Sequence, residues 1–301
     1  MTVRDLVVDL CAEHLDAVTG DPVPLQALVG LLAACGVAEP STRAAASALR
    51  RAGWLTASRR GRETLLAPTA ALRAAVTTRC DRVRSRLGPW DGEWRMVVYG
   101  VPETDRAARE RVRRGLARAG FGPLAPATWV SPHAAALEEV RAELAGERTS
   151  RLDLLTARVA DPRLSDADLA TRCWDLPRLA AAWTRVLDRL RAVADAVPQG
   201  PAALGRHLRL RADVRAVLTG DPLLPPALQP EAWPAREVRD AWADAGARLA
   251  AAARAHVAEV LGAVTPRTAA WSGLPAGARR ERARGGGSEV LRQRWTPDMS
   301  G

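Results

Sequence analysis

The residues best suited to chemistry in this sequence are arginines near the N-terminus. Arg43, Ser47 and Arg50 recur at i, i+4 and i+7, which places them on one face of a helix. Shortly afterwards Arg59-Arg60-Gly61-Arg62 gathers three guanidinium groups around a glycine. Guanidinium groups bind phosphate oxygens bidentately and can pair with the major-groove edge of guanine. These two groups therefore favour recognition of a nucleic acid.

The segments around the arginines predict a helix-turn-helix followed by a hairpin. Apolar residues at helical spacing indicate three helices, with Gly36 ending the second and Ser41 expected as the N-cap of the third. Two short strands then flank the basic tip, and such a hairpin is typical of the wing of a winged helix. A further helix should close the domain. We expect helices at residues 6–15, 25–35, 41–51 and 70–86, and strands at 54–58 and 63–67.

If these elements form, the third helix is the recognition helix. Such a helix presents its first turns to base edges, while the wing reaches phosphate or the minor groove. Ala44, Ala48 and Leu49 should then point into the domain. A solvated basic helix with an ordinary hairpin is the alternative. The predicted contacts are Arg43 with guanine, Ser41 and Thr42 near phosphate, Ser47 and Arg50 on the same face, and Arg59, Arg60 and Arg62 from the wing.

Composition agrees with a polyanionic partner. The 301 residues carry a formal net charge of +10, with arginine but no lysine, and 48% hydrophobic residues allow more than one buried core. The four cysteines lie far apart with no CxxC pair, so we expect reduced thiols and no metal site. Early acidic residues argue against a signal peptide, and no apolar run is long enough for a membrane span. We expect a cytoplasmic protein without a membrane partner.

The rest of the chain predicts two more domains and a tail. A βαββαβ rhythm between residues 89 and 162 is typical of a ferredoxin-like sandwich. Long helices dominate residues 163–264, apart from a Pro-rich apolar connection at 220–234 that should pack as a rigid link. Glycine, proline and arginine dominate residues 265–301, which predicts a disordered tail. The expected class is α+β, mainly helical, with residues 1–88 as the N-terminal domain.

Several motifs together resemble the PaaX-type repressors of aromatic-acid catabolism. The run from Leu31 to Leu55 is similar to the DNA-binding domain of that family, and Gly61-Arg62 to its wing. Further similarities occur in the same order along the chain. They are Trp90-Asp91-Gly92-Glu93-Trp94, Val101-Pro102-Glu103, Gly120 to Leu124, Trp129 to Pro132, Asp221 to Pro225, Leu228-Gln229-Pro230 and Trp233-Pro234.

The resemblance implies a winged helix, a central ferredoxin-like (Cas2-like) domain and a C-terminal helical domain. It also implies a homodimeric repressor of double-stranded operator DNA, released by an acyl- or aryl-coenzyme A thioester. Arginines suit coenzyme A phosphates and tryptophans suit an acyl group. The wing departs from the family pattern, because Leu65 and Leu66 stand where tyrosines are usual. The expected effector contacts are Arg106, Arg109, Trp129, Arg215 and Trp233.

Two other functions stay open at this point. One is a repurposed family member that binds or converts a small molecule after losing DNA binding, and the other is a structural scaffold. Asp91 and Glu103 lie where a nuclease-like fold would hold a metal carboxylate, but an Asp in that position is more often a turn cap. The histidines His14, His133, His207 and His256 form no recognisable nucleophile motif. We therefore expect no catalytic residue and no cofactor.

Overall fold

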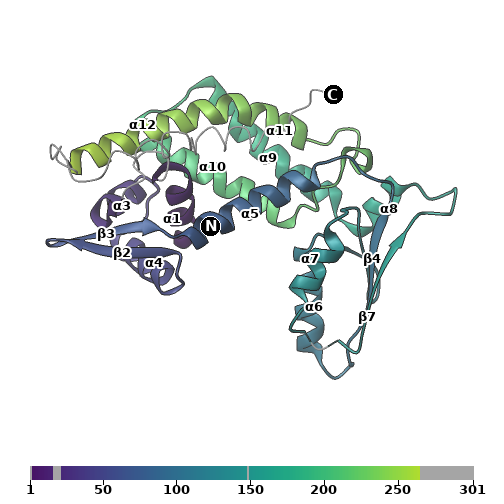
Figure 1. Ribbon diagram of the computed structural model, residues 1–301. Coiled ribbons are helices and arrows are strands. Elements are labelled where there is room, and N and C mark those ends of the chain that lie inside the picture. Colours follow the sequence, from purple (N-terminus) through teal and green to yellow (C-terminus); the bar gives the residue numbers. More distant parts are fainter. Residues whose placement is uncertain (1, 16–21, 148, 265–301) are drawn as a thin grey trace, which may run out of the picture. The chain divides into compact units, whose positions relative to one another are not determined.

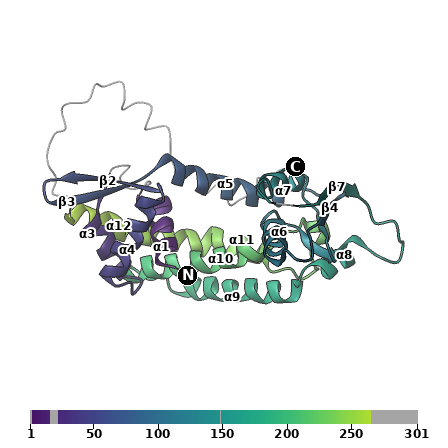
Figure 2. The same ribbon diagram turned by 90° about the horizontal axis from the view of Figure 1, so that it is seen from below.

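The computed structural model describes residues 2–15, 22–147 and 149–264 (Figures 1 and 2). Contacts divide them into two compact units. Unit 1 contains the described residues up to Asp81 together with 184–215 and 235–264, and unit 2 contains 82–183 and 216–234. The expected mixed helix-and-sheet class, mainly helical, is confirmed. Segments that the sequence assigned to separate N- and C-terminal domains contribute to the same unit.

Unit 1 begins with three helices. Helix α1 (Val3–Leu10) starts at a capping box between Thr2 and Asp5 and continues into a single π-helical turn, η1 (Cys11–Leu15). Helix α3 (Leu25–Ala33) is followed by a tight turn in which Gly36 has φ of +75°, a conformation that favours glycine. Helix α4 (Glu39–Arg51) contacts both α1 and α3. The structure therefore contains the three predicted helices and a tight turn between the second and the third.

The start of α4 differs from the prediction. The helix begins at Glu39, with Ala38 in the N-cap position, so Ser41 is not the N-cap. Pro40 lies inside the first turn rather than before the helix. A proline is tolerated there because the first N–H groups of a helix have no intrahelical partner. Pro40 therefore does not mark the boundary that the sequence suggested.

A three-stranded antiparallel sheet follows α4, with the order β1-β3-β2. Strands β2 (Leu55–Arg60) and β3 (Glu63–Pro68) form the predicted hairpin, and each extends beyond its expected range. Gly61 at the tip has φ of +61°. Strand β1 (Val23–Pro24), which the sequence did not predict, pairs with β3. Helix α5 (Ala70–Arg86) occupies the predicted range.

Helices from the C-terminal half complete the core of unit 1. Helix α10 (Gly200–Gly220) contributes Leu204 and Leu208 to the cluster formed by the N-terminal helices, and α12 (Ala247–Val264) contributes Val257. A Cβ on Gly205 would lie 2.4 Å from the Ala34 carbonyl oxygen, so α10 approaches the end of α3 closely. Helix α9 (Leu176–Asp195) precedes α10. The last helical segment is divided into α11 (Ala235–Ala241), the π-helical turn η3 (Trp242–Gly246) and α12.

Unit 2 contains a four-stranded antiparallel sheet of order β5-β6-β4-β7. Its elements follow the predicted βαββαβ sequence, and helices α6 and α7 cover one face of the sheet (Figure 1). Val97 and Tyr99 alternate along β4 and pack against Val112, Leu116 and Val140 of the helices. The bounds are β4 (Trp94–Gly100), α6 (Arg106–Arg118), β5 (Gly122–Ala125), β6 (Thr128–Ser131), α7 (Ala136–Glu143) and β7 (Arg151–Ala157).

Two further segments belong to unit 2. Helix α8 (Asp166–Cys173), which was not predicted, starts at a Ser165–Asp168 capping box and contacts β5. The Pro-rich segment is packed as predicted, since Asp221 to Pro225 are buried ahead of the 3₁₀ turn η2 (Pro226–Leu228). Buried Asp221 accepts hydrogen bonds from the Trp183 indole at 2.5 Å and from the Leu223 N–H at 2.7 Å. The predicted tail at 265–301 lies outside the described residues.

Among the helices of the described ranges, none combines the length and apolar character that crossing a bilayer requires.

Candidate nucleic-acid interface

The exposed face of α4 carries most of the predicted recognition residues. Ser41, Arg43 and Arg50 are exposed, and Ser47 is half-buried. The opposite face packs into the core through Ala45, Ala46 and Leu49 at helical spacing, together with the side chain of Thr42. The arginines are therefore held outward by burial of the other side of the helix.

Two of the predictions for α4 do not match its orientation. Thr42 is fully buried, and its hydroxyl lies 3.5 Å from the Ala38 carbonyl oxygen, so it is not available to a phosphate. Ala44 is exposed, whereas Ala45 and Ala46 supply the buried contacts. In a helix rich in alanine, residue type alone does not identify which alanines face the core.

Arg43 is exposed but held in place. Its Nε donates to Glu39 Oε1 at 2.7 Å, and its Nη2 donates to Gln26 Oε1 at 3.2 Å. Gln26 lies in the first turn of α3, so this bond joins α3 to α4. Arg51 donates to the Ser47 hydroxyl at 3.0 Å. The side chains on this face are therefore partly ordered by one another.

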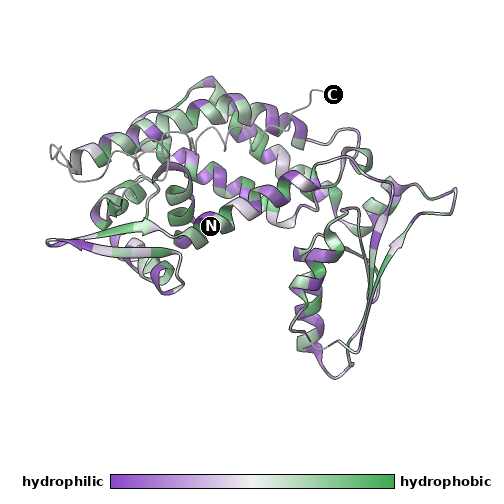
Figure 3. Cartoon of the chain, viewed as in Figure 1, coloured by the Kyte–Doolittle hydropathy of each residue, from purple (hydrophilic) through white to green (hydrophobic). Residues whose placement is uncertain are grey.

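The hairpin tip, which we call the basic hairpin (Arg59, Arg60 and Arg62 on β2–β3), projects beyond the helices of unit 1 (Figure 1). Colouring by hydropathy shows hydrophilic residues at this tip (Figure 3). Arg60 pairs with Glu63 across the turn at 3.0 Å. Arg59 and Arg62 are exposed and form no ion pair with a residue that the structure describes.

The α4 face and the basic hairpin are parts of one structure. Helix α4 contacts β2, and the Trp54 N–H donates to the Leu49 carbonyl oxygen at 2.9 Å where the helix passes into the strand. The Thr69 hydroxyl lies 2.9 Å from the Gly53 carbonyl oxygen, which ties the end of the hairpin to the same turn. This arrangement can present guanidinium groups to a polyanion from two neighbouring elements.

The expected effector residues have unlike surroundings. Arg106 is exposed and Arg109 is half-buried at the start of α6, and neither is paired with a carboxylate among the described residues. Trp129 is buried in the core of unit 2, and Trp233 is also buried. Arg215 belongs to unit 1 and forms an ion pair with buried Asp9 of α1. Of this set, only Arg106 is an exposed arginine without a carboxylate partner among the described residues.

Asp91 forms a turn cap. Its carboxylate accepts a hydrogen bond from the Glu93 N–H at 3.0 Å and pairs with Arg95. The Arg95 hydrogen bond lowers the pKa of Asp91, which burial alone would raise. This geometry agrees with a turn-capping role for Asp91 rather than with a metal ligand.

Sequence reasoning missed one group of side chains. Glu13 and His14 on η1 lie beside His207 on α10, although nearly two hundred residues separate them in the chain. No local spacing reports this group, because the packing of α10 on the N-terminal helices creates it.

Comparison with known proteins gives a consistent result over most of the chain. Three family models match: PaaX-like protein at residues 3–67, PaaX protein central Cas2-like domain at 87–169, and PaaX-like protein C-terminal domain at 174–259. The chain is 28% identical over 250 residues to the transcriptional repressor PaaX of Escherichia coli (strain K12), covering 80% of this chain and 78% of that protein.

A solved structure is also similar. The uncharacterized protein Rv0674 from Mycobacterium tuberculosis matches with a TM-score of 0.60 and 27% sequence identity, over 85% of this chain and 98% of that one. The three family models together extend from the first helix to α12, in the order in which the domains occur here. The chain therefore belongs to the PaaX family.

Proposed function

We propose that this protein is a DNA-binding transcriptional repressor. The observation that carries the proposal is the outward face of α4 next to the basic hairpin, which together expose Arg43, Arg50, Arg59 and Arg62. The similarity to the E. coli repressor supports the same function. Since a repressor acts where the chromosome lies, we propose the cytoplasm as its location.

The roles of the arginines follow from their surroundings. Arg43 keeps a defined geometry through Glu39 and Gln26, and a guanidinium of defined orientation suits bidentate pairing with guanine. Arg50, Ser41 and Ser47 lie on or beside the same face and suit positioning contacts with the DNA backbone. Arg59 and Arg62 on the hairpin suit phosphate or minor-groove contacts. Thr42 is left out because it is buried.

We propose the corresponding fold names on the same basis. Three helices followed by a hairpin in a β1-β3-β2 sheet support a winged helix for the N-terminal segment. The βαββαβ order with the sheet order β5-β6-β4-β7 supports a ferredoxin-like sandwich for the central segment. The domain division proposed from the sequence, 1–88, 89–162 and 163–264, agrees in order with the three family models.

A metabolite that releases the repressor is a second part of the proposal. Arg106 is exposed and Arg109 is half-buried, and neither has a carboxylate partner among the described residues. Two such guanidinium groups suit the phosphates of an acyl- or aryl-coenzyme A thioester. Trp129 and Trp233 are both buried, so either side chain must leave its packed position before it can contact that ligand. Release requires that the ligand prefer a conformation that does not fit the operator.

We also propose a homodimer, which fits a two-fold symmetric operator.

The test is a fluorescence-anisotropy titration of the purified chain against the region upstream of its own gene and against a scrambled duplex. We expect a sequence-preferring complex at moderate salt, with Arg43→Ala reducing the preference and Arg248→Ala, an exposed arginine on α12, leaving it unchanged. Equal binding of both duplexes, or no binding of either, contradicts the proposal.

Addition of phenylacetyl-coenzyme A or acetyl-coenzyme A to the complex tests the effector. The thioester should release the DNA, and the double variant Arg106→Ala with Arg109→Ala should show less release.

A further inference from the structure

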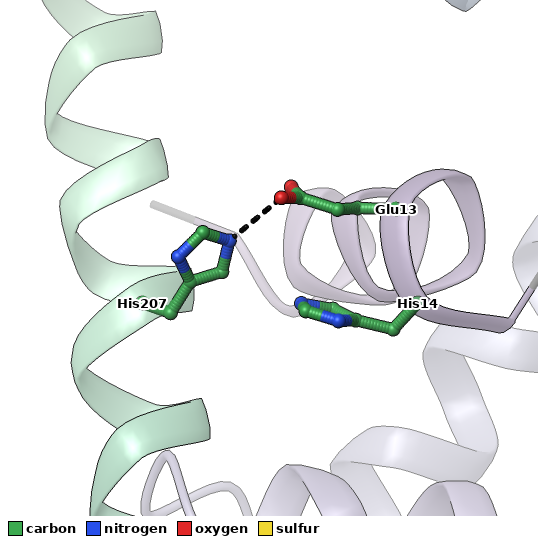
Figure 4. A group of neighbouring side chains, drawn as sticks. All are labelled: Glu13, His14 and His207. Carbon is green, nitrogen blue, oxygen red and sulfur yellow. Dashed lines mark hydrogen bonds and ion pairs between the residues drawn. The ribbon is translucent and has the colours of Figure 1, made fainter. Parts of the chain in front are cut away.

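Three side chains in unit 1 converge on one point inside the protein. Glu13 and His14 project from η1, the turn that continues α1, and His207 projects toward them from α10 (Figure 4). One potential ligand atom from each lies within 4.8 Å of the others. Both histidines are fully buried, and the Glu13 side chain is 11% exposed. This cluster, which we call the His–Glu cluster, has no part in the interface described above.

The hydrogen bonds of the His–Glu cluster are incomplete. His207 Nε2 lies 3.0 Å from Glu13 Oε1, as the dashed line in Figure 4 marks. His207 Nδ1 and both ring nitrogens of His14 have no hydrogen-bond partner among the residues that the structure describes. Buried polar atoms in native proteins almost always have a partner. Three unpartnered imidazole nitrogens close to a carboxylate therefore point to a ligand that binds nitrogen and oxygen together.

The backbone around the cluster is unusual in the same place. Glu13 and His14 are neighbours in sequence, and successive residues of an ordinary α-helix point in directions about 100° apart. They lie in the π-helical turn η1, and a second π-helical turn, η3, carries Trp242, whose ring centroid is 6.2 Å from that of His207. Single π-helical turns within helices occur frequently at functional sites.

Arg211 and Arg254 both bring positive charge near the cluster, which opposes a cation. The position of Arg211 limits its opposition. Its guanidinium pairs with Glu13 Oε2, whereas Oε1 faces His207. A carboxylate can bind a metal through one oxygen while the other accepts a hydrogen bond that orients it. Arg211 therefore suits the role of an outer partner that fixes the Glu13 carboxylate.

We propose that Glu13, His14 and His207 bind a divalent transition-metal ion of the zinc type. Two imidazoles and a carboxylate form a common ligand set for such ions, at metal–ligand distances of about 2.0–2.2 Å. Three protein ligands leave a further coordination position for water or an anion. The ion joins the N-terminal helices, of which α1 contacts α4, to helix α10.

The direct test is a titration of the full chain, stripped with EDTA and desalted, with Zn²⁺ in competition with a chromophoric chelator. We expect one equivalent of Zn²⁺ per chain, and a loss of affinity of about tenfold or more in His207→Gln and in Glu13→Gln. The control is His256→Gln combined with Glu259→Gln, which removes another histidine–carboxylate pair, on α12, and should bind Zn²⁺ as the wild type does. No binding by the wild type, or equal binding by all variants, overturns the proposal.

Two further measurements separate metal binding from folding. Co²⁺ should give the visible bands of a nitrogen- and oxygen-ligated ion, without the thiolate charge-transfer band that binding at a cysteine would produce. His14→Phe should have a melting temperature equal to or above that of the wild type without metal, because it removes an unpartnered buried imidazole. Addition of Zn²⁺ should raise the melting temperature of the wild type but not that of His14→Phe. A thiolate band, or an equal rise in both, contradicts the assignment.

Discussion

Arg43 of α4 donates through Nη2 to the side-chain oxygen of Gln26 on α3, at 3.2 Å. The same guanidinium donates through Nε to Glu39 one helical turn earlier. The residue that we assign to base recognition is therefore oriented before DNA arrives. Its carboxylate partner is also a competitor, because a negative charge beside the recognition face repels phosphate.

Replacing Glu39 with glutamine should strengthen DNA binding. The change removes that repulsion and keeps a hydrogen-bond acceptor for Arg43. Since exposed ion pairs contribute about 0.2–1 kcal/mol, the gain should be about 1.4- to fivefold in affinity at fixed salt. Anisotropy titrations measure it, with Glu237→Gln, which removes the Arg191 partner on α11, as the control. Weaker binding by Glu39→Gln would mean that Glu39 serves mainly to orient Arg43.

Removing Arg59 and Arg62 together should weaken binding to all sequences alike. Both are exposed on the basic hairpin without ion-pair partners among the described residues. The logarithm of the binding constant falls with the logarithm of the salt concentration, and each phosphate contact makes this slope steeper by about 0.9. The double alanine variant should therefore have a slope that is shallower by about two units. Titrations between low and moderate salt measure this. An unchanged slope would exclude the hairpin from the interface.

Gly205→Ala should destabilise unit 1. The new Cβ would lie 2.4 Å from the Ala34 carbonyl oxygen, so α10 must move away from the end of α3. We expect a cost of about 1–3 kcal/mol in the free energy of unfolding, measured by chemical denaturation. The matched control is Gly30→Ala at an exposed position of α3, where a Cβ meets no atom within 4 Å, and it should stabilise the helix by about 0.5–1 kcal/mol. Equal effects of the two changes would show that α10 does not pack closely there.

His133 should make unit 2 sensitive to acid. The ring is buried and its Nε2 lies 2.7 Å from the Pro222 carbonyl oxygen, and burial lowers its pKa to about 4. The neutral ring stabilises the folded state fully above the unfolded pKa of about 6.5, and that stability is lost as the pH falls from there towards 4. His133→Gln should therefore be less stable at pH 7 but lose less stability between pH 7 and pH 5. Denaturation midpoints at the two pH values check this, and parallel losses in both proteins would contradict it.

The sequence determined most of the elements and their order, with β1 and α8 as exceptions. Apolar spacing, glycines and prolines located the three N-terminal helices, the basic hairpin, α5 over its whole length and the βαββαβ succession, because these signals act within a few residues of each other. The outward position of Arg43 and Arg50 was also predicted, since charged side chains stay in water. Where the signals were ambiguous, as at Pro40 and Ser41, the predicted N-cap of α4 was wrong by three residues.

Tertiary structure decided what depends on distant segments. Which alanines of α4 are buried is set by the helices packed against them, and residue type alone does not distinguish Ala44 from Ala45. The N- and C-terminal segments share one core because Leu204, Leu208 and Val257 cover apolar surface that the first helices leave open. The same packing brings His207 to Glu13 and His14. Hydrophobic burial is not directional, so a pattern shows that a face must be covered but not which part of the chain covers it.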